Sequence, residues 1–444
     1  MDLSRPSRTG RKDIELRRVT DLPTYVFDVV DRWKAEAVAE DRDIIDFGIG
    51  SHDLGTPEPA IERLVAEARD PARHGYPSSA GLPELRHELA RWYAGRYAVT
   101  IDPETQALVT WGASEALSHL PWVLLGPGDT ALVPGPCYPI HSYAILFSGA
   151  RPMPVPMLAP AARPDDTAGG EAGVVEESAG GHAEAGSIAA DDPEATPEDH
   201  DEALFERFVA AHAAARPRPR VALLSFPHNP TTRCVEVGFF ERLVDFARET
   251  DLVIVHDFAY ADIAFDGYRP PSILQVAGAD EVAVELVSLS KSHNMAGWRL
   301  GMVAGRQEIV AALRRLKSYL DYGVTTPVQL MALTALRECT DTPPRMAATY
   351  QRRRDALCAG LRDIGWPVPY PRGTMFVWAP LPAAQRAMGS LAFARHLFDA
   401  AGIAVSPGIG FGPEGEGHVR FALVQPEARI REALVRLAPA LRAG

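Results

Sequence analysis

Lysine is scarce in this chain of 444 residues, which uses arginine for nearly all of its positive charge. Of the 45 basic residues only four are lysines, namely Lys12, Lys34, Lys291 and Lys317. Arginine cannot form an imine because its guanidinium stays protonated, whereas a lysine amine can once burial or a neighbouring cation lowers its pKa. Any imine chemistry in this chain therefore has very few candidate residues.

Cysteine is also rare, and long apolar runs are missing. The four cysteines lack CxxC spacing, which favours free thiols in a reducing compartment over disulfides or zinc. No run of 18 apolar residues occurs, and the charged N-terminus lacks the apolar core of a secretory signal. The histidines show neither HxxxH nor HExxH spacing, so we expect no metal site. These absences predict a cytoplasmic protein that does not contact a membrane.

Negative charge is concentrated in one segment. The formal net charge of −13 argues against nucleic acid as a partner. Residues 161–200 contain eleven Asp or Glu against Arg163 alone, a net charge of about −10, and hardly any large apolar side chains. Such a segment cannot bury enough surface to offset its ordering entropy. We therefore predict a disordered acidic insertion at about residues 160–201.

Hydrophobic patterning predicts alternating strands and helices over most of the chain. Apolar segments typical of strands lie at 107–110, 130–133, 220–225, 252–256, 282–289 and 300–303, and amphipathic segments separate them. This alternation predicts an α/β fold with a mainly parallel central sheet. We expect an N-terminal arm at 1–24, a large domain at 58–324, and a smaller α+β domain formed by 25–57 and 325–444.

Lys291 lies where a predicted buried strand ends, at the edge of the sheet where ligands bind in open α/β folds. Ser288 precedes it and Arg299 follows it, and this hydroxyl and guanidinium suit a phosphate dianion. Residues 111–117 form a turn of small residues that opens a helix, and such a turn can also hold a phosphate. Each signal is weak alone, since Lys291 could be an ordinary surface lysine.

Two further polar residues follow predicted strands. Asp257 ends an apolar strand, where a buried carboxylate needs a cationic partner such as a pyridinium nitrogen, although it could simply cap a helix. Asn229, before Pro230, could contact a phenolic oxygen or merely form a turn. Together these loops offer a phosphate cradle, a pyridine-nitrogen partner, a phenolate partner and an imine lysine. That combination suits pyridoxal phosphate and few other ligands.

Five strings of residues carry a resemblance to a known family. They are Tyr76–Arg86, Phe226–Thr231, His256–Asp262, Ser288–Arg299 and the pair Ser406–Gly412 with His418–Leu423. With them, residues 25–158 and 202–440 resemble the fold-type I pyridoxal-phosphate enzymes of aminotransferase class I/II, most closely the bacterial glutamate–pyruvate (alanine) aminotransferases. The resemblance implies a three-layer fold with a mainly parallel sheet in the large domain, a homodimer, and pyridoxal 5'-phosphate as cofactor.

The resemblance also implies roles for individual residues around the cofactor ring. Lys291 would form the covalent imine and later shuttle a proton. Asp257 would hold the pyridinium nitrogen, Asn229 and Tyr260 would bind the phenolic oxygen, and Tyr138 would stack on the ring. The catalytic residues would thus be Lys291, Asp257 and Tyr260.

Phosphate and substrate contacts follow from the same resemblance. Arg420 would take the substrate α-carboxylate, helped by Asn229 and the amide of Gly50, and Tyr76 would reach the phosphate of the neighbouring subunit. The residues expected to hold the phosphate within one chain are Ala113, Ser114, Ser288 and Arg299.

We therefore predict an aminotransferase that acts on small amino acids and 2-oxo acids, with glutamate and pyruvate giving 2-oxoglutarate and alanine. The alternatives are an aspartate, LL-diaminopimelate or methionine aminotransferase, a carbon–sulfur lyase on the same scaffold, and more remotely a pyridoxal-phosphate-sensing regulator. Two positions depart from the family pattern, His52 near the substrate entrance and His293 just after the lysine. Both departures concern substrate preference more than cofactor binding.

Overall fold

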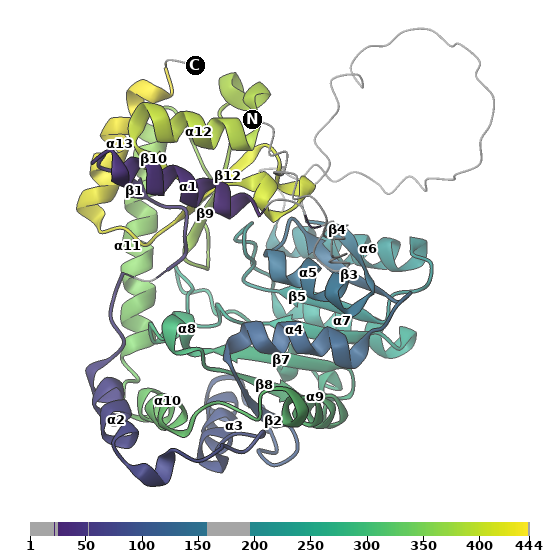
Figure 1. Cartoon of the computed structure of the whole chain (residues 1–444). Helices are drawn as coiled ribbons and strands as arrows, with labels where there is room; N and C mark the ends of the chain where they lie inside the picture. The colour runs from purple at the N-terminus through teal and green to yellow at the C-terminus, as the bar shows by residue number, and fades with distance from the viewer. Residues whose placement is uncertain (1–21, 23–24, 52, 158–195, 443–444) are drawn as a thin grey trace, which may run out of the picture.

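The computed structural model describes residues 22, 25–51, 53–157 and 196–442 (Figure 1). The predicted arm 1–24, His52 and most of the predicted acidic insertion lie outside the described residues. The insertion was predicted to extend too far, because residues 197–201 form the start of helix α6 (Pro197–Ala214). Thr196 and Asp199 form a reciprocal capping box there, and this local signal determines the structure despite the acidic composition.

A seven-stranded sheet forms the centre of the molecule. Its strand order is β2-β8-β7-β6-β5-β3-β4, and only β8 runs against the other strands, since both of its pairings are antiparallel. The strands are β2 (Ala107–Thr110), β3 (Thr130–Gly135), β4 (Arg151–Pro156), β5 (Val221–Ser225), β6 (Val253–Asp257), β7 (Ala283–Ser288) and β8 (Gly301–Gly305). The prediction of a mainly parallel sheet is confirmed.

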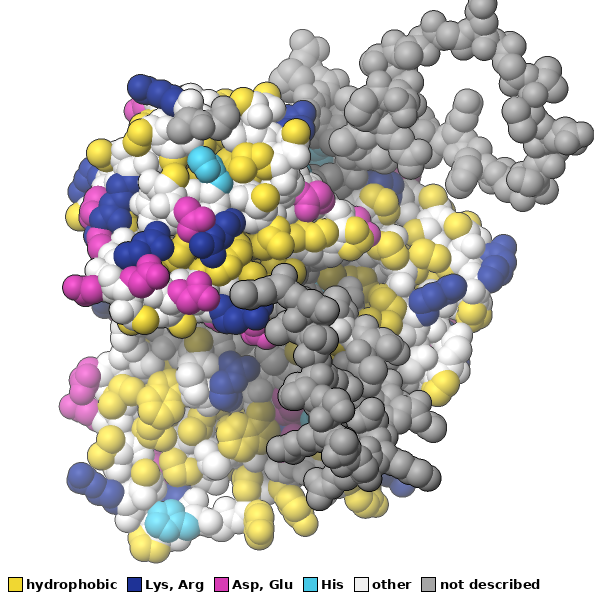
Figure 2. All heavy atoms as spheres, turned by 45° about the horizontal axis from the view of Figure 1, so that its top comes forward, with side chains coloured by type: hydrophobic (Ala, Val, Ile, Leu, Met, Phe, Trp, Pro, Cys, Tyr) yellow, Lys and Arg dark blue, Asp and Glu magenta, His cyan; other side chains and the backbone are white. Residues whose placement is uncertain are grey.

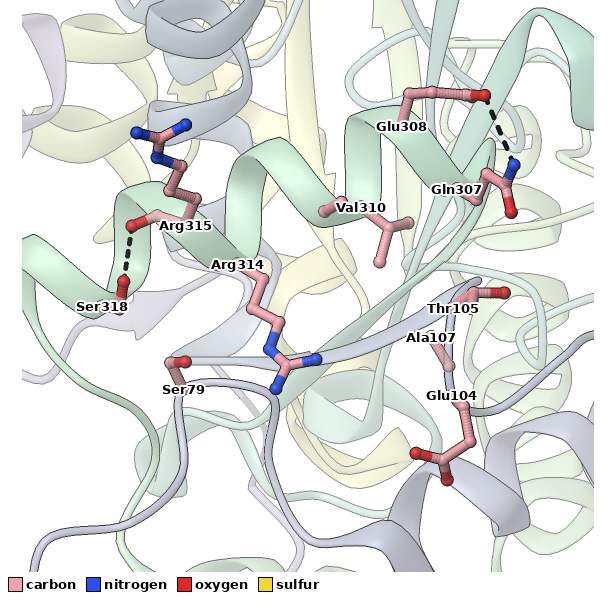
Figure 3. Close-up of a pocket in the computed structure, with 11 residues that line it drawn as sticks. Ser79, Glu104, Thr105, Ala107, Gln307, Glu308, Val310, Arg314, Arg315 and Ser318 are labelled. Carbon is pink, nitrogen blue, oxygen red and sulfur yellow. Dashed lines mark hydrogen bonds between the residues drawn. The ribbon is translucent and has the colours of Figure 1, made fainter.

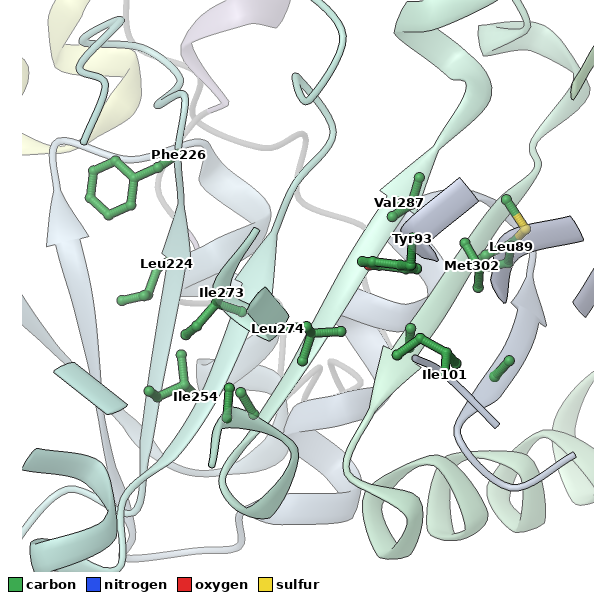
Figure 4. Packing of buried hydrophobic residues seen from close by; sticks show 14 of the residues in the cluster. Leu89, Tyr93, Ile101, Leu224, Phe226, Ile254, Ile273, Leu274, Val287 and Met302 are labelled. Carbon is green, nitrogen blue, oxygen red and sulfur yellow. The ribbon is translucent and has the colours of Figure 1, made fainter. Parts of the chain in front are cut away.

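Alternate side chains of each strand point to opposite faces of this sheet. In β5, Val221 and Leu223 join one apolar cluster, whereas Ala222 and Leu224 join another. Every residue of β5 is buried, as expected for a parallel strand covered on both faces. Figure 4 shows part of the larger cluster, in which Leu224 and Ile254 of adjacent strands pack against Ile273.

Helices cover both faces, so the sheet region has three layers (Figure 1). The helices whose residues pack on one face are α4 (Gly112–Leu124), α5 (Pro139–Ser148) and α9 (Gln307–Leu320). Those packed on the other face are α2 (Glu58–Ala68), α3 (Pro83–Tyr97), α6, α7 (Val237–Thr250) and α10 (Thr326–Glu338). Helix α10 packs on the core of the sheet region, although the predicted boundary at 325 placed it in the smaller domain. Helical periodicity does not reveal which core a helix covers, so the sequence could not show this.

A second region has its own apolar core, which includes Phe47, Tyr350 and Trp366. It contains a parallel pair of short strands and a three-stranded antiparallel sheet in the order β11-β12-β9. Its elements are α1 (Val26–Ala39), β1 (Ile45–Asp46), α11 (Thr342–Asp363), β9 (Phe376–Pro380), α12 (Ser390–Ala401), β10 (Ile403–Ala404), β11 (Ser406–Pro407), β12 (His418–Ala422) and α13 (Glu427–Ala440). We call this the small region.

Strand β4 forms one edge of the seven-stranded sheet, and the sequence did not predict it. Its residues at 152, 154 and 156 are prolines, which made the segment look unlike a strand. The backbone N–H groups of Arg151 and Met157 donate to β3 and its flank, so odd-numbered residues point their N–H groups inward. The prolines therefore occupy the positions whose nitrogens point away from the sheet.

Basic and acidic side chains lie side by side on the upper part of the face shown in Figure 2. In the small region, for example, Asp43 pairs with both Arg429 and Arg436. Among the described residues no helix is long and apolar enough to cross a membrane. All four cysteines are free thiols in the structure.

Candidate active site

A cavity of about 460 Å³ lies between the sheet region and the small region. The carboxyl ends of β5, β6 and β7 open into it, and the small region contributes the loop after β1 together with β9 and β12. All of the predicted site residues except Tyr76 line this cavity, namely Gly50, Ala113, Ser114, Tyr138, Asn229, Asp257, Tyr260, Ser288, Lys291, Arg299 and Arg420. Residues that span 370 positions in the sequence are thus brought together.

Lys291 lies in a one-turn helix, α8 (Leu289–Ser292), rather than in the loop that was expected after β7. Its Nζ donates a hydrogen bond of 2.9 Å to the carbonyl oxygen of Gly50. Desolvation lowers the pKa of this amine to about 8, and the positive charges of Arg420 and Arg299 act in the same direction. Lys291 is therefore a usable amine nucleophile near neutral pH.

Asp257 ends β6 with its carboxylate buried against the cavity. Its Oδ2 lies 3.0 Å from Nε2 of His141, and its Oδ1 accepts a hydrogen bond from the backbone of Ala259. His141, on the first turn of α5, is buried and was not predicted from the sequence. The available clue was that a buried carboxylate needs a partner, but nothing in the sequence connects positions 116 residues apart.

The start of α4 forms the candidate phosphate cradle. Ala113 and Ser114 occupy its first turn, and Nη2 of Arg299 lies 3.3 Å from Oγ of Ser114. The turn packs tightly on β8, because a Cβ on Gly301 would lie only 2.6 Å from the backbone nitrogen of Ala113. Gly112 has φ of +71°, a conformation that glycine adopts at little cost. Helix dipole, free amides and guanidinium together favour an anion here.

Arg420 is buried on β12 at the opposite side of the cavity. Its Nη1 donates to Oδ1 of Asn229 at 2.7 Å, and its Nη2 donates to Ser406 and the backbone of Gly48, each at 3.2 Å. Burial lowers its pKa to about 10, so the guanidinium stays charged at neutral pH. Because Asn229 accepts through its oxygen, its amide N–H groups remain available to a ligand.

Two tyrosines complete the lining. Burial raises the pKa of Tyr260 far above its ordinary value, so its hydroxyl stays protonated and can donate a hydrogen bond. Tyr138, the residue before α5, is 37% exposed and lies beside His141 with a ring separation of 5.9 Å. An exposed aromatic face at this position suits stacking on a flat ring.

Tyr76 does not line the cavity of its own chain. Its ring is 89% exposed and lies 5.2 Å from the ring of Tyr322. His293, the family departure after the lysine, is buried beside a small hollow on the far side of β7, together with Asp262 and Trp92. It therefore does not line the candidate active site.

Another hollow of about 500 Å³ lies on the surface between α9 and the segment before β2. Figure 3 shows Arg314 reaching from α9 into the space beside Ser79, with Glu104 on the opposite segment and Gln307 bonded to Glu308 further along the helix. None of the predicted site residues lines it. Charged and polar groups converge around Lys291 in the cavity between the sheet region and the small region. We therefore identify that cavity, and not this surface hollow, as the candidate active site.

Residues 42–437 match the family model for aminotransferase class I and II. The chain belongs to this family. It is 43% identical to the glutamate-pyruvate aminotransferase AlaC of Escherichia coli, over 96% of this chain and 93% of that protein. It is 39% identical to an LL-diaminopimelate aminotransferase of Desulforudis audaxviator, over 96% and 97%. A solved aspartate aminotransferase variant of Thermus thermophilus superposes with a TM-score of 0.80 at 26% identity, covering 97% and 100%.

Aminotransferases of this family depend on pyridoxal 5'-phosphate, and this aminotransferase is a transaminase of that kind. The cavity fits the cofactor. It offers an amine of lowered pKa for the aldehyde, a buried carboxylate for the ring nitrogen, and a helix start with a guanidinium for the phosphate. Oγ of Ser225, which also lines the cavity, is buried without a hydrogen-bond partner among the described residues. Such an atom is expected to find its partner in a bound molecule.

Proposed function

We propose that this aminotransferase transfers the amino group of L-glutamate to pyruvate, which yields 2-oxoglutarate and L-alanine. The observation that carries the proposal is the buried Arg420, whose guanidinium faces the same cavity as Lys291. A bidentate arginine pair selects a substrate α-carboxylate. The 43% identity to the E. coli glutamate-pyruvate enzyme supports this pair of substrates.

The charges in the cavity support a small, neutral side chain on one of the substrates. Among the described lining residues the cations are Lys291, Arg299 and Arg420, and each has a role in the proposed site. No further cation of the described chain lines the cavity to bind a second carboxylate. Pyruvate and alanine have no second carboxylate and need no such cation. The γ-carboxylate of glutamate would bind a group outside this cavity lining, such as one from a second subunit.

LL-diaminopimelate is the competing substrate, because an LL-diaminopimelate aminotransferase is 39% identical to this chain. Its distal ammonium group would need a free carboxylate in the cavity. Asp31 lines the cavity, but its carboxylate already pairs with Lys34 at 2.6 Å. A paired carboxylate attracts a second cation less strongly, which favours the glutamate–pyruvate assignment.

The residues of this chain would act as follows in the proposed reaction. Arg420 and Asn229 hold the α-carboxylate, so the Cα–H bond of the amino acid faces Lys291. Nζ of Lys291 would remove the Cα proton and pass it to the aldehyde-derived carbon of the bound cofactor, next to the transferred nitrogen, rather than back to Cα. Bound pyridoxal phosphate supplies a ring that accepts the electron pair left on Cα. Asp257, held by His141, keeps the ring nitrogen protonated.

We also propose a cytoplasmic homodimer. Tyr76, Tyr319, Leu320 and Tyr322 are exposed on one chain at 49% or more, and a second copy would bury them. This would also place Tyr76 where the resemblance expects it, at the phosphate of the neighbouring subunit. The four free thiols support a reducing compartment.

Stopped-flow absorbance with the cofactor-loaded enzyme tests the substrate proposal. L-glutamate and L-alanine should each convert the bound aldehyde to the amine, at a kcat/KM at least 100-fold above that of LL-diaminopimelate, L-aspartate or L-methionine. Faster conversion by LL-diaminopimelate than by alanine would contradict the substrate pair and leave the transaminase chemistry intact. Release of pyruvate from cystathionine without any amino acceptor would instead indicate a carbon–sulfur lyase.

A further inference from the structure

Lys317 is a fully buried lysine on helix α9 that does not line the cavity around Lys291, and the proposed mechanism does not use it. Its Nζ donates to Oε2 of Glu115 on α4 at 2.7 Å and to Oδ1 of Asp321 at 3.0 Å. Burying an ammonium group costs several kcal/mol of lost hydration unless partners compensate for it. Two carboxylates do so here, in a chain that has only four lysines.

Glu115 links this ammonium group to the candidate phosphate cradle. The same Oε2 atom accepts the backbone N–H of Trp111 at 2.7 Å, and Oε1 lies 2.9 Å from Nδ1 of His119. Trp111 is the residue that precedes α4, and the next turn contains Ala113 and Ser114. The position of that first turn therefore depends on a carboxylate that Lys317 holds in place.

The cluster has the ligand types of a metal site. Ligand atoms of Glu115, His119 and Asp321 lie within 4.8 Å of one another. However, the ammonium group of Lys317 bonds to both carboxylates of this group. The ammonium group of Lys317 thus already occupies the place where a metal ion would bind. We call Lys317, Glu115 and Asp321 the buried ion-pair cluster.

The buried ion-pair cluster is also connected to the exposed pair Tyr76 and Tyr322. Asp321 and Tyr322 both donate their backbone N–H groups to the carbonyl oxygen of Lys317, at 3.1 and 3.0 Å. Tyr322 has φ of +60° and lies beside Tyr76. One lysine therefore connects the phosphate cradle of its own chain with the tyrosine proposed to reach the phosphate of a second chain.

We propose that Lys317 is a positioning residue for the cofactor phosphate. This inference rests on the proposed cofactor site. Without the ammonium group, two carboxylates face each other in a buried place, and Glu115 becomes protonated or turns away from the backbone N–H of Trp111. The start of α4 then loses the hydrogen bond that ties Trp111 to Glu115, and the amides that bind the phosphate lose their alignment. The residues expected to contact the pyridine ring, Asp257, Asn229 and Tyr138, lie outside α4 and stay in place.

The test compares pyridoxal phosphate with pyridoxal, which lacks the phosphate, in binding to the apoenzyme. Imine absorbance reports the Kd of each ligand for the wild type and for Lys317→Met. We expect the Kd of pyridoxal phosphate to rise at least tenfold in the variant, equivalent to about 1.4 kcal/mol, and the Kd of pyridoxal to change less than threefold. Equal weakening of both ligands, or no weakening, would overturn the proposal, since a purely structural role affects both alike.

Two further variants test whether the effect depends on the charges of Lys317 and Glu115. Lys317→Met combined with Glu115→Gln removes both opposite charges and retains an acceptor for Trp111, so the Kd of pyridoxal phosphate should return to within threefold of wild type. If Lys317→Met fails to fold, Glu115→Ala tests the same link, and we expect the same selective loss of pyridoxal phosphate. Unselective loss, or none, in Glu115→Ala would contradict the proposal.

Lys34→Met is the matched control. Lys34 also bonds to two carboxylates, those of Asp31 and Asp46, but lies in the small region away from α4. The ratio of the two Kd values should stay at the wild-type level in this variant, and a selective loss of pyridoxal phosphate there would count against a specific role for Lys317. A wild-type enzyme that binds neither ligand would contradict the cofactor site, whereas unchanged selectivity in Lys317→Met contradicts only this inference.

Discussion

At the scale of single residues, the cavity sets Lys291 apart from an ordinary lysine. Its pKa is lowered from 10.5 to about 8, first by desolvation and then by two neighbouring guanidinium groups. At pH 7 roughly a tenth of such amines are neutral, against fewer than one in a thousand for a typical lysine. The chain thereby obtains a nucleophile without a separate general base next to it.

The rate of imine formation by the apoenzyme should follow this pKa. Only the neutral amine attacks an aldehyde, so the rate with pyridoxal should rise tenfold per pH unit below about 8 and level off above it. Absorbance kinetics between pH 6 and 10 measure this profile, and Lys291→Ala should show no imine band. A rate that still rises steeply at pH 10 would contradict the lowered pKa.

Sequence and structure differ in an instructive way at this scale. Lys291, Asp257 and Asn229 could be found because each follows a strand, and the ends of parallel strands meet at one edge of the sheet. His141 could not be found, because it reaches Asp257 from a helix packed across the sheet. Arg420 came from the resemblance alone, since its β12 strand lies in the other region.

At the scale of elements, glycine at 301 allows β8 to pack directly against the start of α4. Gly301→Ala should displace this turn, because the added Cβ would lie 2.6 Å from backbone atoms of Gly112 and Ala113. We expect at least a tenfold loss of affinity for pyridoxal phosphate, measured by absorbance titration. Gly297→Ala is the control, because a Cβ there meets nothing within 4 Å. Equal affinities of the two variants would refute this account of the cradle.

A buried polar network joins the sheet to two helical segments. Glu285 on β7 is fully buried and accepts hydrogen bonds from Tyr93 at 2.9 Å, Ser272 at 2.6 Å and the backbone of Ile273 at 3.0 Å. The first two donate to Oε1, and Oε2, which accepts from Ile273, also lies 2.7 Å from Nδ1 of His256, the residue before Asp257. The network therefore anchors the strand that presents the carboxylate to the cavity.

Removing this carboxylate should destabilise the fold strongly. Glu285→Ala leaves several buried donors without an acceptor, and we expect a loss of about 3 kcal/mol or more in the free energy of unfolding. Urea denaturation followed by circular dichroism measures it. The exposed Glu241 on α7 is the control, and Glu241→Ala should change stability by about 0.5 kcal/mol at most. A similar small change for Glu285→Ala would show that the network contributes little.

Element boundaries show where sequence patterns are insufficient. The central strands were predicted because they are short, mostly apolar runs, and the structure buries every residue of β5 and β7. The start of α6 was missed because acidic composition outweighed the capping signal at Thr196. Helix α10 was assigned to the wrong core because periodicity gives a buried face without the element that covers it.

At the scale of the whole molecule, the proposed dimer would share its active sites. Lys291→Ala and Tyr76→Ala chains should each have low activity at limiting cofactor. In a mixed dimer, the Tyr76→Ala chain keeps its lysine and receives an intact tyrosine from its partner. Random mixing makes half of the dimers mixed, with one intact site each, so we expect about a quarter of wild-type activity.

The control for this experiment mixes Lys291→Ala with Asp257→Ala. Both residues line the cavity of a single chain, so no mixed dimer of this kind has an intact site. Activity should therefore stay at the sum of the separate chains. If the Tyr76 mixture behaves in the same way, the tyrosine does not serve a neighbouring subunit.

Strand β4 has a consequence for the chain as a whole. The prolines at 152, 154 and 156 leave its outer side without a backbone donor between those positions. An approaching strand from another molecule would find carbonyl oxygens but nothing to complete a ladder. Crowded copies of this enzyme are thereby protected from joining edge to edge into fibrils at this border.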